Sequence, residues 1–423
     1  MDKVVTKKNN GLRGEITIPP DKSISHRAIM FSSLAKGRSL INNLSRGEDC
    51  ISTLRLFRSL GVDITQTGER NVEIFSSGKF SPQKKELDCG NSGTTMRLCS
   101  GILAGQDFKT VLYGDESLSK RPMGRVITPL EMMGASIKSS SGFAPLKING
   151  KKLKGITYNL PIASAQVKSC VLLAGLNAEG TTTVIEKFPS RNHTELMLEY
   201  MGANITTDVN SVSVSQSILE PRVINVAGDI SSAAYFIVAG LTVPNSDVVI
   251  KKVGLNPTRT GIIDVVRRMG GNIEILDSSV ASGELVGDIR VQYSELKGCN
   301  IQGADIPRLI DELPVIALLA TQAEGETVIS DAEDLRKKES DRITTITNGL
   351  KSIGANIEEK QDGFIISGKT KLSGDKELDV FHDHRLAMSY YVAGLISEKD
   401  ILIKDFQWVD ISFPEFESLF AKL

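Results

Sequence analysis

The sequence predicts a mixed α/β (α+β) protein of two domains, each built from copies of one repeat. Three observations support this prediction. A chain of 423 residues is longer than one compact core usually accommodates, so two domains are expected. A short glycine-containing phrase recurs along the chain, after a helical stretch and before a strand. Apolar stretches such as 169–174 and 315–320 have no polar face, which is typical of helices buried beneath sheets.

The recurring phrase consists of a hydrophobic residue, a glycine, two variable residues and a hydrophobic residue that is isoleucine in every copy. Its copies are Leu60–Ile64, Met133–Ile137, Met201–Ile205, Met269–Ile273 and Ile353–Ile357. Glycine just past a helix adopts the left-handed cap conformation, and the isoleucine then begins a strand. Each copy therefore predicts where one helix ends and one strand starts.

A second phrase, which begins with leucine in most copies and often ends in glycine, recurs out of step with the first. Its copies are 34–37, 103–105, 176–180, 241–245, 323–325 and 395–399. The two phrases together predict six repeats of roughly 70 residues, longer than the common solenoid periods.

The sixth repeat stops at Leu423, where its glycine is expected. We expect the amino-terminal strand around 14–18 to complete it, which places both termini in one domain. The prediction is a discontinuous domain of 1–18 plus 228–423, an inserted domain of 19–227, and an active site in the cleft between them.

Composition excludes several classes of function. The 50 lysines and arginines nearly balance 51 acidic residues, so there is no overall attraction to nucleic acid or membranes. Aromatic residues make up only 5%, too few for base-stacking surfaces. No secretion signal or membrane-spanning stretch is evident, and the five scattered cysteines form no CxxC pair. We expect a soluble, cytoplasmic monomer without nucleic-acid or membrane partners.

Polar and basic residues gather where helices are expected to begin, and the first such place follows Pro19 and Pro20. The prolines delay the helix, so Lys22 and Ser23 are expected at its N-terminus and Arg27 one turn later. A lysine, a hydroxyl, a guanidinium and free backbone N–H groups suit a carboxylate or phosphate. An ordinary serine cap beside solvated charges is the alternative.

Similar arrangements recur in nearly every repeat. Gly93 allows an anion to approach the backbone at another helix start. Asp311 precedes a proline-started helix, where a helix cap is the alternative. Lys338 and Arg342 are expected one turn apart at the start of a further helix, where exposed ion pairs are the alternative. Further segments of this kind are Leu118–Met123, Pro161–Lys168, Ser190–Glu195 and Phe381–Arg385. Parallel helices would direct these groups into one cleft that holds two anions.

His382 and His384 lie close together in the last of these segments. The chain has only four histidines, and no third ligand stands nearby, so no metal site is predicted.

Taken together and in order, these segments resemble the 5-enolpyruvylshikimate-3-phosphate synthases, the 3-phosphoshikimate 1-carboxyvinyltransferases, over nearly the whole chain. The segments most similar to the second bacterial class of that family are Asp21–Ser23, Ser164–Lys168, Arg191–Glu195 and Asn256–Arg259. The resemblance implies two inside-out α/β barrel domains, each of three βαβαββ repeats. It also implies transfer of the enolpyruvyl group of phosphoenolpyruvate to the 5-hydroxyl of shikimate 3-phosphate, in the shikimate pathway, without metal or organic cofactor.

The resemblance also implies the residues of the site. For shikimate 3-phosphate they are Lys22, Ser23, Arg27, Ser164, Ala165 (through its backbone), Gln166, Arg191, Asp311 and Lys338. For phosphoenolpyruvate they are Lys22, Gly93, Arg121, Gln166, Arg342 and Arg385. Asp311 is the expected base toward the hydroxyl, and Glu339 and Lys22 are expected to handle the proton at the methylene carbon.

Two alternatives remain open at this point. One is the related transferase that acts on UDP-N-acetylglucosamine, which carries a reactive cysteine in the loop before its Arg-Pro pair. The corresponding loop here, 114–122, contains no cysteine. The other is a non-catalytic repeat protein that binds small anions.

Overall fold

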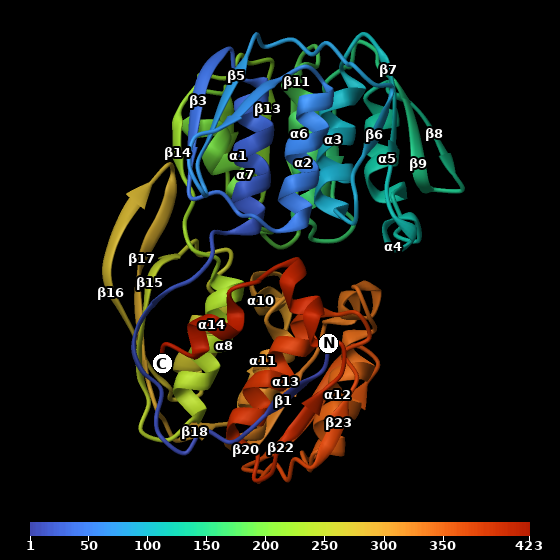
Figure 1. Cartoon of the computed structure of the whole chain (residues 1–423). Helices are drawn as coiled ribbons and strands as arrows, with labels where there is room; N and C mark the ends of the chain where they lie inside the picture. The colour runs from blue at the N-terminus through green and yellow to red at the C-terminus, as the bar shows by residue number, and fades with distance from the viewer. The chain divides into compact units, whose positions relative to one another are not determined.

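The computed structural model describes residues 1–423, which fall into two compact units (Figure 1). The terminal unit comprises Met1–Pro19, Gly228–Ser279 and Leu285–Leu423. The inserted unit comprises Pro20–Ala227 and the short segment Val280–Glu284. The predicted boundaries had this short segment in the domain of the termini.

The inserted unit contains seven helices and twelve strands. The helices are α1 (Lys22–Leu34), α2 (Glu48–Ser59), α3 (Gly93–Ala104), α4 (Glu116–Ser119), α5 (Gly124–Met132), α6 (Ala165–Gly175) and α7 (His193–Tyr200). The strands are β3 (Gly37–Asn42), β4 (Asp63–Gln66), β5 (Val72–Ser76), β6 (Glu86–Asp88), β7 (Lys109–Tyr113), β8 (Ser136–Ser140), β9 (Phe143–Asn149), β10 (Thr157–Asn159), β11 (Thr181–Ile185), β12 (Ile205–Thr207), β13 (Ser211–Ser215) and β14 (Val223–Asn225).

These strands form three sheets with one pattern: β14-β3-β5-β4, β6-β7-β9-β8 and β10-β11-β13-β12. In each sheet the first pair is parallel and the next two pairs are antiparallel. The first sheet takes its edge strand β14 from the end of the inserted segment, since Val223–Asn225 pairs with Leu40–Asn42. The three repeats of this unit therefore share strands between its beginning and its end.

The terminal unit follows the same plan. Its helices are α8 (Ile230–Thr242), α9 (Gly261–Arg268), α10 (Ile306–Leu309), α11 (Leu313–Thr321), α12 (Arg342–Ser352), α13 (His384–Ile396) and α14 (Phe416–Phe420), with 3-10 turns η1 (Gly303–Asp305), η2 (Glu333–Lys337) and η3 (Phe406–Ile411). Its strands are β1 (Lys3–Val5), β2 (Arg13–Thr17), β15 (Asp247–Gly254), β16 (Asn272–Ala281), β17 (Glu284–Gln292), β18 (Leu296–Lys297), β19 (Asn300–Ile301), β20 (Ala323–Ile329), β21 (Ile357–Lys360), β22 (Gly363–Gly368), β23 (Lys376–Leu378) and β24 (Ile401–Ile403). The sheets are β16-β17-β15-β2, β18-β20-β22-β21 with β19 beside β20, and β1-β24-β23.

The helices that lack a polar face lie inside, as predicted. Every residue of α11 is buried, and α6 is buried from Val167 onward. Within the terminal unit, α8, α11 and α13 pack against one another, and Figure 1 shows strands on the outside of this group. Burial of these apolar helices removes their surface from water and is the main source of stability in each core. The predicted fold class, α/β with helices inside and sheets outside, is confirmed.

The repeat phrase also has the predicted backbone conformation. Its five glycines all have positive φ: Gly61 (84°), Gly134 (97°), Gly202 (77°), Gly270 (80°) and Gly354 (101°). In each copy a strand begins at the isoleucine or one residue before it. Glycine serves here because a Cβ would be strained in the left-handed region.

The sixth repeat is completed by an amino-terminal strand other than the predicted one. Lys3–Val5 (β1) pairs antiparallel with Ile401–Ile403 (β24). The strand expected there, around 14–18, is β2, which pairs parallel with β15 in the fourth repeat. Both amino-terminal strands thus fill places in repeats that come much later in the chain.

None of the helices is both long and apolar enough to cross a bilayer.

Candidate functional site

The expected site residues gather at the N-termini of the inner helices. The starts of α1, α3, α6 and α13 are each capped by a side chain that accepts a backbone N–H, from Asp21, Ser92, Ser164 and Asp383. Uncompensated N–H groups and the helix dipole make such starts favourable for anions.

The first turn of α1 carries Lys22 and Ser23, as the two preceding prolines predicted. Lys22 forms an ion pair with Asp49 in the first turn of α2. Lys22 and Ser23 are both partly buried, so a ligand can reach them. A lysine shared between a carboxylate and an open helix start is suited to binding an anion or to exchanging a proton.

Arg27 lies one turn further on and is only 3% exposed. Its Nη1 donates to the Ser23 carbonyl at 3.0 Å, its Nε to Thr194 Oγ1 at 2.8 Å and its Nη2 to Ser169 Oγ at 2.8 Å. Burial lowers the pKa of Arg27 to about 10, which leaves it charged at neutral pH. Its contacts join α1 to α6 and α7, so Arg27 holds three helix starts of the site together.

Gly93, the first residue of α3, faces two guanidinium groups. A Cβ at this position would come 3.1 Å from Arg97 Nη1 and 3.6 Å from Arg121 Nη1. Arg97 donates to Gln166 Oε1 at 2.5 Å, and Arg121 donates to Asn91 Oδ1 at 3.1 Å. The absence of a side chain therefore keeps the helix start open beside two cations. Three predicted residues, Gly93, Arg121 and Gln166, are brought together here.

Arg97 was missed by sequence analysis as a site residue. It follows Gly93 by one helical turn on α3, which is the spacing between Ser23 and Arg27 on α1. This spacing was the signal that would have found it.

At the start of α6, Ser164 caps the helix by accepting from Val167 N at 3.5 Å. Ala165 is the first helical residue, and Gln166 Nε2 donates to Thr94 Oγ1 at 2.9 Å. Gln166 thus contacts α3 through both ends of its amide.

Lys168, on the same helix, is 1% exposed and lies between two buried carboxylates. Its Nζ is 2.6 Å from Glu186 Oε1 and 2.6 Å from Glu195 Oε1, and it donates to the Ser190 carbonyl at 3.2 Å. The Ser190 N–H donates to Glu186 Oε2 at 3.1 Å. These bonds fix the segment between β11 and α7, in which the partly buried Arg191 lies. The charge of Arg191 is close enough to lower the pKa of Arg27.

In the terminal unit the predicted residues surround Asp311. Its Oδ1 lies 3.1 Å from Lys338 Nζ and 3.7 Å from Arg342 Nη1. Its carbonyl accepts from Arg385 Nη1 at 3.1 Å. The Asp311 side chain is 15% exposed. A partly exposed carboxylate can accept a proton from a substrate, and the three cations beside it can hold the anionic groups of that substrate.

Arg342 joins this cluster to the start of α13. It is 1% exposed, and its Nε donates to Asp383 Oδ2 at 2.7 Å, while Nη2 donates to Glu339 Oε2 at 2.7 Å. Burial alone would lower the pKa of Arg342, but the carboxylates of Asp383 and Glu339 raise it. Burial alone would raise the pKa of Asp383, but Arg342 lowers it. Both groups are therefore ionised at neutral pH.

One prediction about this cluster was wrong, and one of its residues was not predicted. Lys338 and Arg342 are not one turn apart on a helix, because α12 begins only at Arg342 and Lys338 follows the 3-10 turn η2. They meet instead because both reach Asp311. Asp383 was missed as a site residue, although an aspartate before a helix start is a common cap signal.

The two histidines of the last segment lie in different surroundings. Burial lowers the pKa of His384 to about 4, so this side chain is neutral at neutral pH. The His382 ring contacts that of Trp408, with centroids 4.6 Å apart and planes tilted by 43°. No group of three or more His, Cys, Asp or Glu side chains is placed to hold a metal ion.

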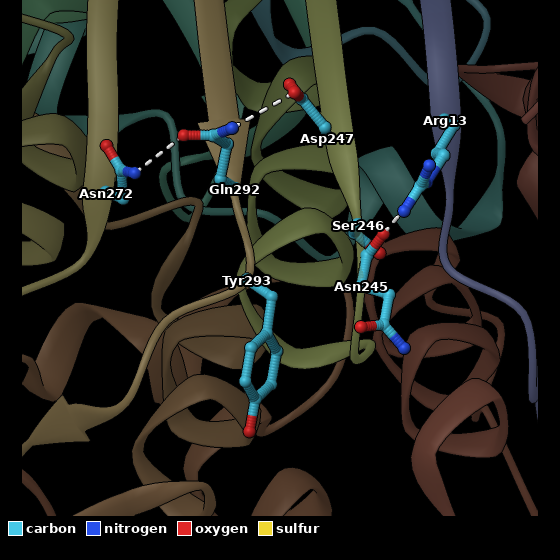
Figure 2. A pocket seen from close by; sticks show the side chains of 7 residues that line it. All are labelled: Arg13, Asn245, Ser246, Asp247, Asn272, Gln292 and Tyr293. Carbon is cyan, nitrogen blue, oxygen red and sulfur yellow. Dashed lines mark hydrogen bonds between the residues drawn. The ribbon is translucent and has the colours of Figure 1, made fainter.

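A separate depression of about 560 Å³ lies in the terminal unit, where β2, β15 and β16 begin and β17 ends (Figure 2). Its polar groups bond to one another: Asn272 donates to Gln292 at 2.7 Å, and Gln292 donates to Asp247 at 3.0 Å. None of the predicted site residues lines it. It lies at the opposite end of β15 from the segment 256–259, about 23 Å along the strand.

Comparison with known proteins decides the family. The model of the family "EPSP synthase (3-phosphoshikimate 1-carboxyvinyltransferase)" matches residues 6–420. The chain belongs to this family.

Individual relatives agree with this assignment. The chain is 53% identical to the 3-phosphoshikimate 1-carboxyvinyltransferase of Thermoanaerobacter sp. (strain X514), over 99% of this chain and 100% of that protein. It is similar to the solved structure of EPSP synthase from Acinetobacter baumannii, with a TM-score of 0.91 and 42% identity, covering 100% of this chain and 98% of that one. The enolpyruvyl transferase NikO from Streptomyces tendae has a TM-score of 0.82 at 16% identity, covering 100% of this chain and 97% of that one, which shows the shared fold alone.

Proposed function

We propose that the chain transfers the carboxyvinyl group of phosphoenolpyruvate to the 5-hydroxyl of shikimate 3-phosphate and releases inorganic phosphate. This proposal rests on the surroundings of Asp311, which is a partly exposed carboxylate with Lys338, Arg342 and Arg385 around it. The reaction needs a base beside cations that hold phosphate and carboxylate groups, and this cluster provides both. Membership of the family supports the choice of substrates.

In this proposal the helix starts of the inserted unit bind shikimate 3-phosphate. Lys22, Ser23 and Ser164 offer an ammonium group and hydroxyls, and the backbone of Ala165 and the side chain of Gln166 lie at the same start of α6. Arg191 adds a second cation in a segment that Lys168 fixes. Arg27 keeps these helix starts in place through its contacts with Ser23, Ser169 and Thr194.

Phosphoenolpyruvate binds in the proposal against the open start of α3, at Gly93, with Arg121, Gln166 and Lys22 around it. Arg342 and Arg385 are also proposed ligands of phosphoenolpyruvate, as the resemblance to the family implies. Arginine suits both of its anionic groups because the planar guanidinium forms paired hydrogen bonds with carboxylate and phosphate oxygens.

The proposed chemistry is an addition followed by an elimination. Asp311 accepts the proton of the 5-hydroxyl as its oxygen bonds to C2 of phosphoenolpyruvate, and the methylene carbon gains a proton. The methyl carbon then loses a proton as the C2–O bond to phosphate breaks. Glu339 and Lys22 handle the proton at this carbon, and the arginines stabilise the departing phosphate. The proton gained at the methylene carbon is lost again in the elimination, and the 5-hydroxyl proton ends on the released phosphate, so the two steps balance without an oxidant or reductant.

The proposed setting is the shikimate pathway in the cytoplasm, with the chain acting as a monomer. The near balance of 50 basic against 51 acidic residues gives the surface no overall attraction to nucleic acid or lipid. Sedimentation of the purified chain at micromolar concentration tests the monomer, for which a single species of about 46 kDa is expected from its 45.8 kDa mass.

Phosphate release tests the activity. The purified chain is given phosphoenolpyruvate together with shikimate 3-phosphate, with UDP-N-acetylglucosamine, or alone. Release only with shikimate 3-phosphate is expected. Release with the sugar nucleotide would favour the related transferase, and silence from a folded protein with all three would favour an anion-binding repeat protein.

A further inference from the structure

Arg259 lies two residues before α9, the second helix of the fourth repeat. Other repeats also have an arginine just before or at the start of this helix: Arg46 before α2, Arg121 before α5, Arg191 before α7 and Arg342 at the first residue of α12. The last three are proposed ligands of a substrate. The side chain of Arg259 is only 3% exposed, similar to that of Arg342 at 1%, but it has different partners.

The guanidinium of Arg259 is held inside the terminal unit by groups from the starts of two inner helices. Its Nη2 donates to Ser231 Oγ at 2.6 Å and lies 3.3 Å from Asp229 Oδ1 and 3.8 Å from Glu312 Oε1. Ser231 Oγ in turn donates to Glu312 Oε1. Asp229 caps α8 by accepting from Ser231 N at 2.9 Å. One arginine and two carboxylates are thus buried together with one hydroxyl between them.

Glu312 connects this cluster to the proposed base. It directly follows Asp311, and its side chain is fully buried. Its N–H donates to the Leu309 carbonyl at 2.9 Å, and its carbonyl accepts from Ile316 N at 3.0 Å, so its backbone forms the turn into α11. On the other side of the same turn, Arg385 donates to the Asp311 carbonyl. The orientation of the Asp311 peptide therefore depends on where the Glu312 side chain is anchored.

The charges explain why this anchor needs an arginine. Without a cation, Asp229 and Glu312 would be two buried carboxylates on neighbouring helix starts, and each would seek water or another partner. Burial alone would lower the pKa of Arg385, but Asp311 and, to a smaller extent, Glu312 and Asp229 raise it, so Arg385 lies within electrostatic reach of this cluster. Loss of Arg259 would leave two carboxylates that attract Arg385 away from the Asp311 carbonyl.

We propose that Arg259 and Glu312 are positioning residues that hold the Asp311 carboxylate in the orientation in which it takes the substrate proton. This inference rests on the proposed function, because it assumes that Asp311 is the base. No proposed substrate contact involves the segment Asn256–Arg259. In this proposal the segment contributes to the reaction through Arg259, which neutralises Glu312, the carboxylate next to Asp311.

The test compares steady-state kinetics of the full-length chain with those of Arg259→Gln, Glu312→Gln and the double variant. Each single variant is expected to lower kcat by about 10- to 100-fold, since misplacement of about 1 Å costs on that order, and to change KM for either substrate by less than about threefold. Because the two residues act through one pair, the double variant is expected to be no slower than the slower single variant. Arg259→Lys, which keeps the charge, is expected to recover part of kcat.

The matched control is Arg268→Gln on α9, which removes a half-exposed arginine that pairs with Asp305 at 2.6 Å. Its kcat is expected to equal that of the unsubstituted chain. Glu312→Gln keeps the shape of the side chain, so it decides the question if Arg259→Gln does not fold.

Three outcomes would overturn the inference: an unchanged kcat in folded Glu312→Gln, a loss confined to KM, or single effects that multiply in the double variant. Failure of the proposed function has a different signature, because the unsubstituted chain itself would then release no phosphate from the two substrates.

Discussion

The two units hold most of their site cations in different ways; the exceptions are Lys22, which pairs with Asp49, and Arg385, which donates to the Asp311 carbonyl. In the inserted unit, Arg27, Arg97 and Arg121 donate to neutral oxygens of hydroxyl, amide and carbonyl groups. In the terminal unit, Lys338 and Arg342 contact the carboxylates of Asp311, Glu339 and Asp383. A neutral acceptor orients a guanidinium and leaves its charge available to an anion, whereas a carboxylate partner cancels part of that charge. From this difference we propose that the arginines of the inserted unit mainly bind anions, and that the terminal unit, together with Lys22, moves protons beside them.

The largest expected effect concerns the terminal unit. Asp311→Asn keeps the size of the side chain and an oxygen that can accept from Lys338, but it removes the base. We expect kcat to fall about 10³-fold, within the range that general bases contribute. Steady-state phosphate release with both substrates measures this. A loss below tenfold would mean that Asp311 is not the base.

The next effect concerns stability and the buried cluster of the inserted unit. Lys168→Met leaves Glu186 and Glu195 buried without their cation, which is expected to cost about 3–5 kcal/mol of unfolding free energy. Urea-induced unfolding measures it. The matched control is Lys120→Met, whose ammonium pairs with Glu116 on the surface, where both side chains are more than 70% exposed. No measurable change is expected there, and equal effects of the two substitutions would contradict the role of burial.

A third effect separates two arginines that are both proposed to bind phosphoenolpyruvate. Arg121→Gln removes a charged donor from the inserted unit and is expected to raise KM for phosphoenolpyruvate by about 10- to 100-fold, with kcat changed only a few fold. Arg385→Gln is expected to raise that KM and also to lower kcat, because Arg385 also bonds to the Asp311 carbonyl. Affinity for shikimate 3-phosphate is expected to remain nearly unchanged in both. If the two variants have the same kcat, the proposed division between the units is wrong.

The smallest expected effect is on the pH dependence of stability, to which one buried histidine in each unit contributes. Burial lowers the pKa of His26 to about 3 and that of His384 to about 4. Their unfolded value of about 6.5 is higher, so below that pH the unfolded chain binds more protons and stability falls as the pH falls. Each histidine is expected to contribute on the order of 2 kcal/mol less stability at pH 5 than at pH 7.5.

Unfolding midpoints of His26→Asn and His384→Asn across this range test the histidines separately. Each variant is expected to lose part of the pH dependence seen between pH 7.5 and pH 5. A variant with an unchanged slope would mean that its histidine binds protons equally in the folded and the unfolded chain, so that folding does not lower its pKa.

Much of the fold followed from local signals. The glycine phrase predicted five helix ends with positive φ, and Pro19 and Pro20 placed the start of α1 at Lys22. These features depend on residues within a few positions of one another, so the sequence shows them directly. The inner position of α6 and α11 followed from their apolar composition for the same reason.

What could not be predicted depends on contacts between distant segments. The sequence around Lys168 indicates only a helix start, because its partners Glu186 and Glu195 lie 18 and 27 residues further along the chain. The pairing of β1 with β24 joins residues about 400 positions apart, and nothing local distinguishes β1 from β2 as the strand that completes the sixth repeat. The helical spacing assumed for Lys338 was wrong because a 3-10 turn ends before α12 begins.

The affinity for shikimate 3-phosphate without phosphoenolpyruvate tests the division between the units most directly. Calorimetric titration is performed on the unsubstituted chain, on Asp311→Asn and on Arg191→Gln. The proposed roles predict a dissociation constant within about threefold of the original for Asp311→Asn, and a weakening of about tenfold or more for Arg191→Gln, which loses a charged hydrogen-bond donor. Equal weakening in both variants, or weakening only in Asp311→Asn, would contradict the assignment of anion binding to the inserted unit and proton transfer to the terminal unit.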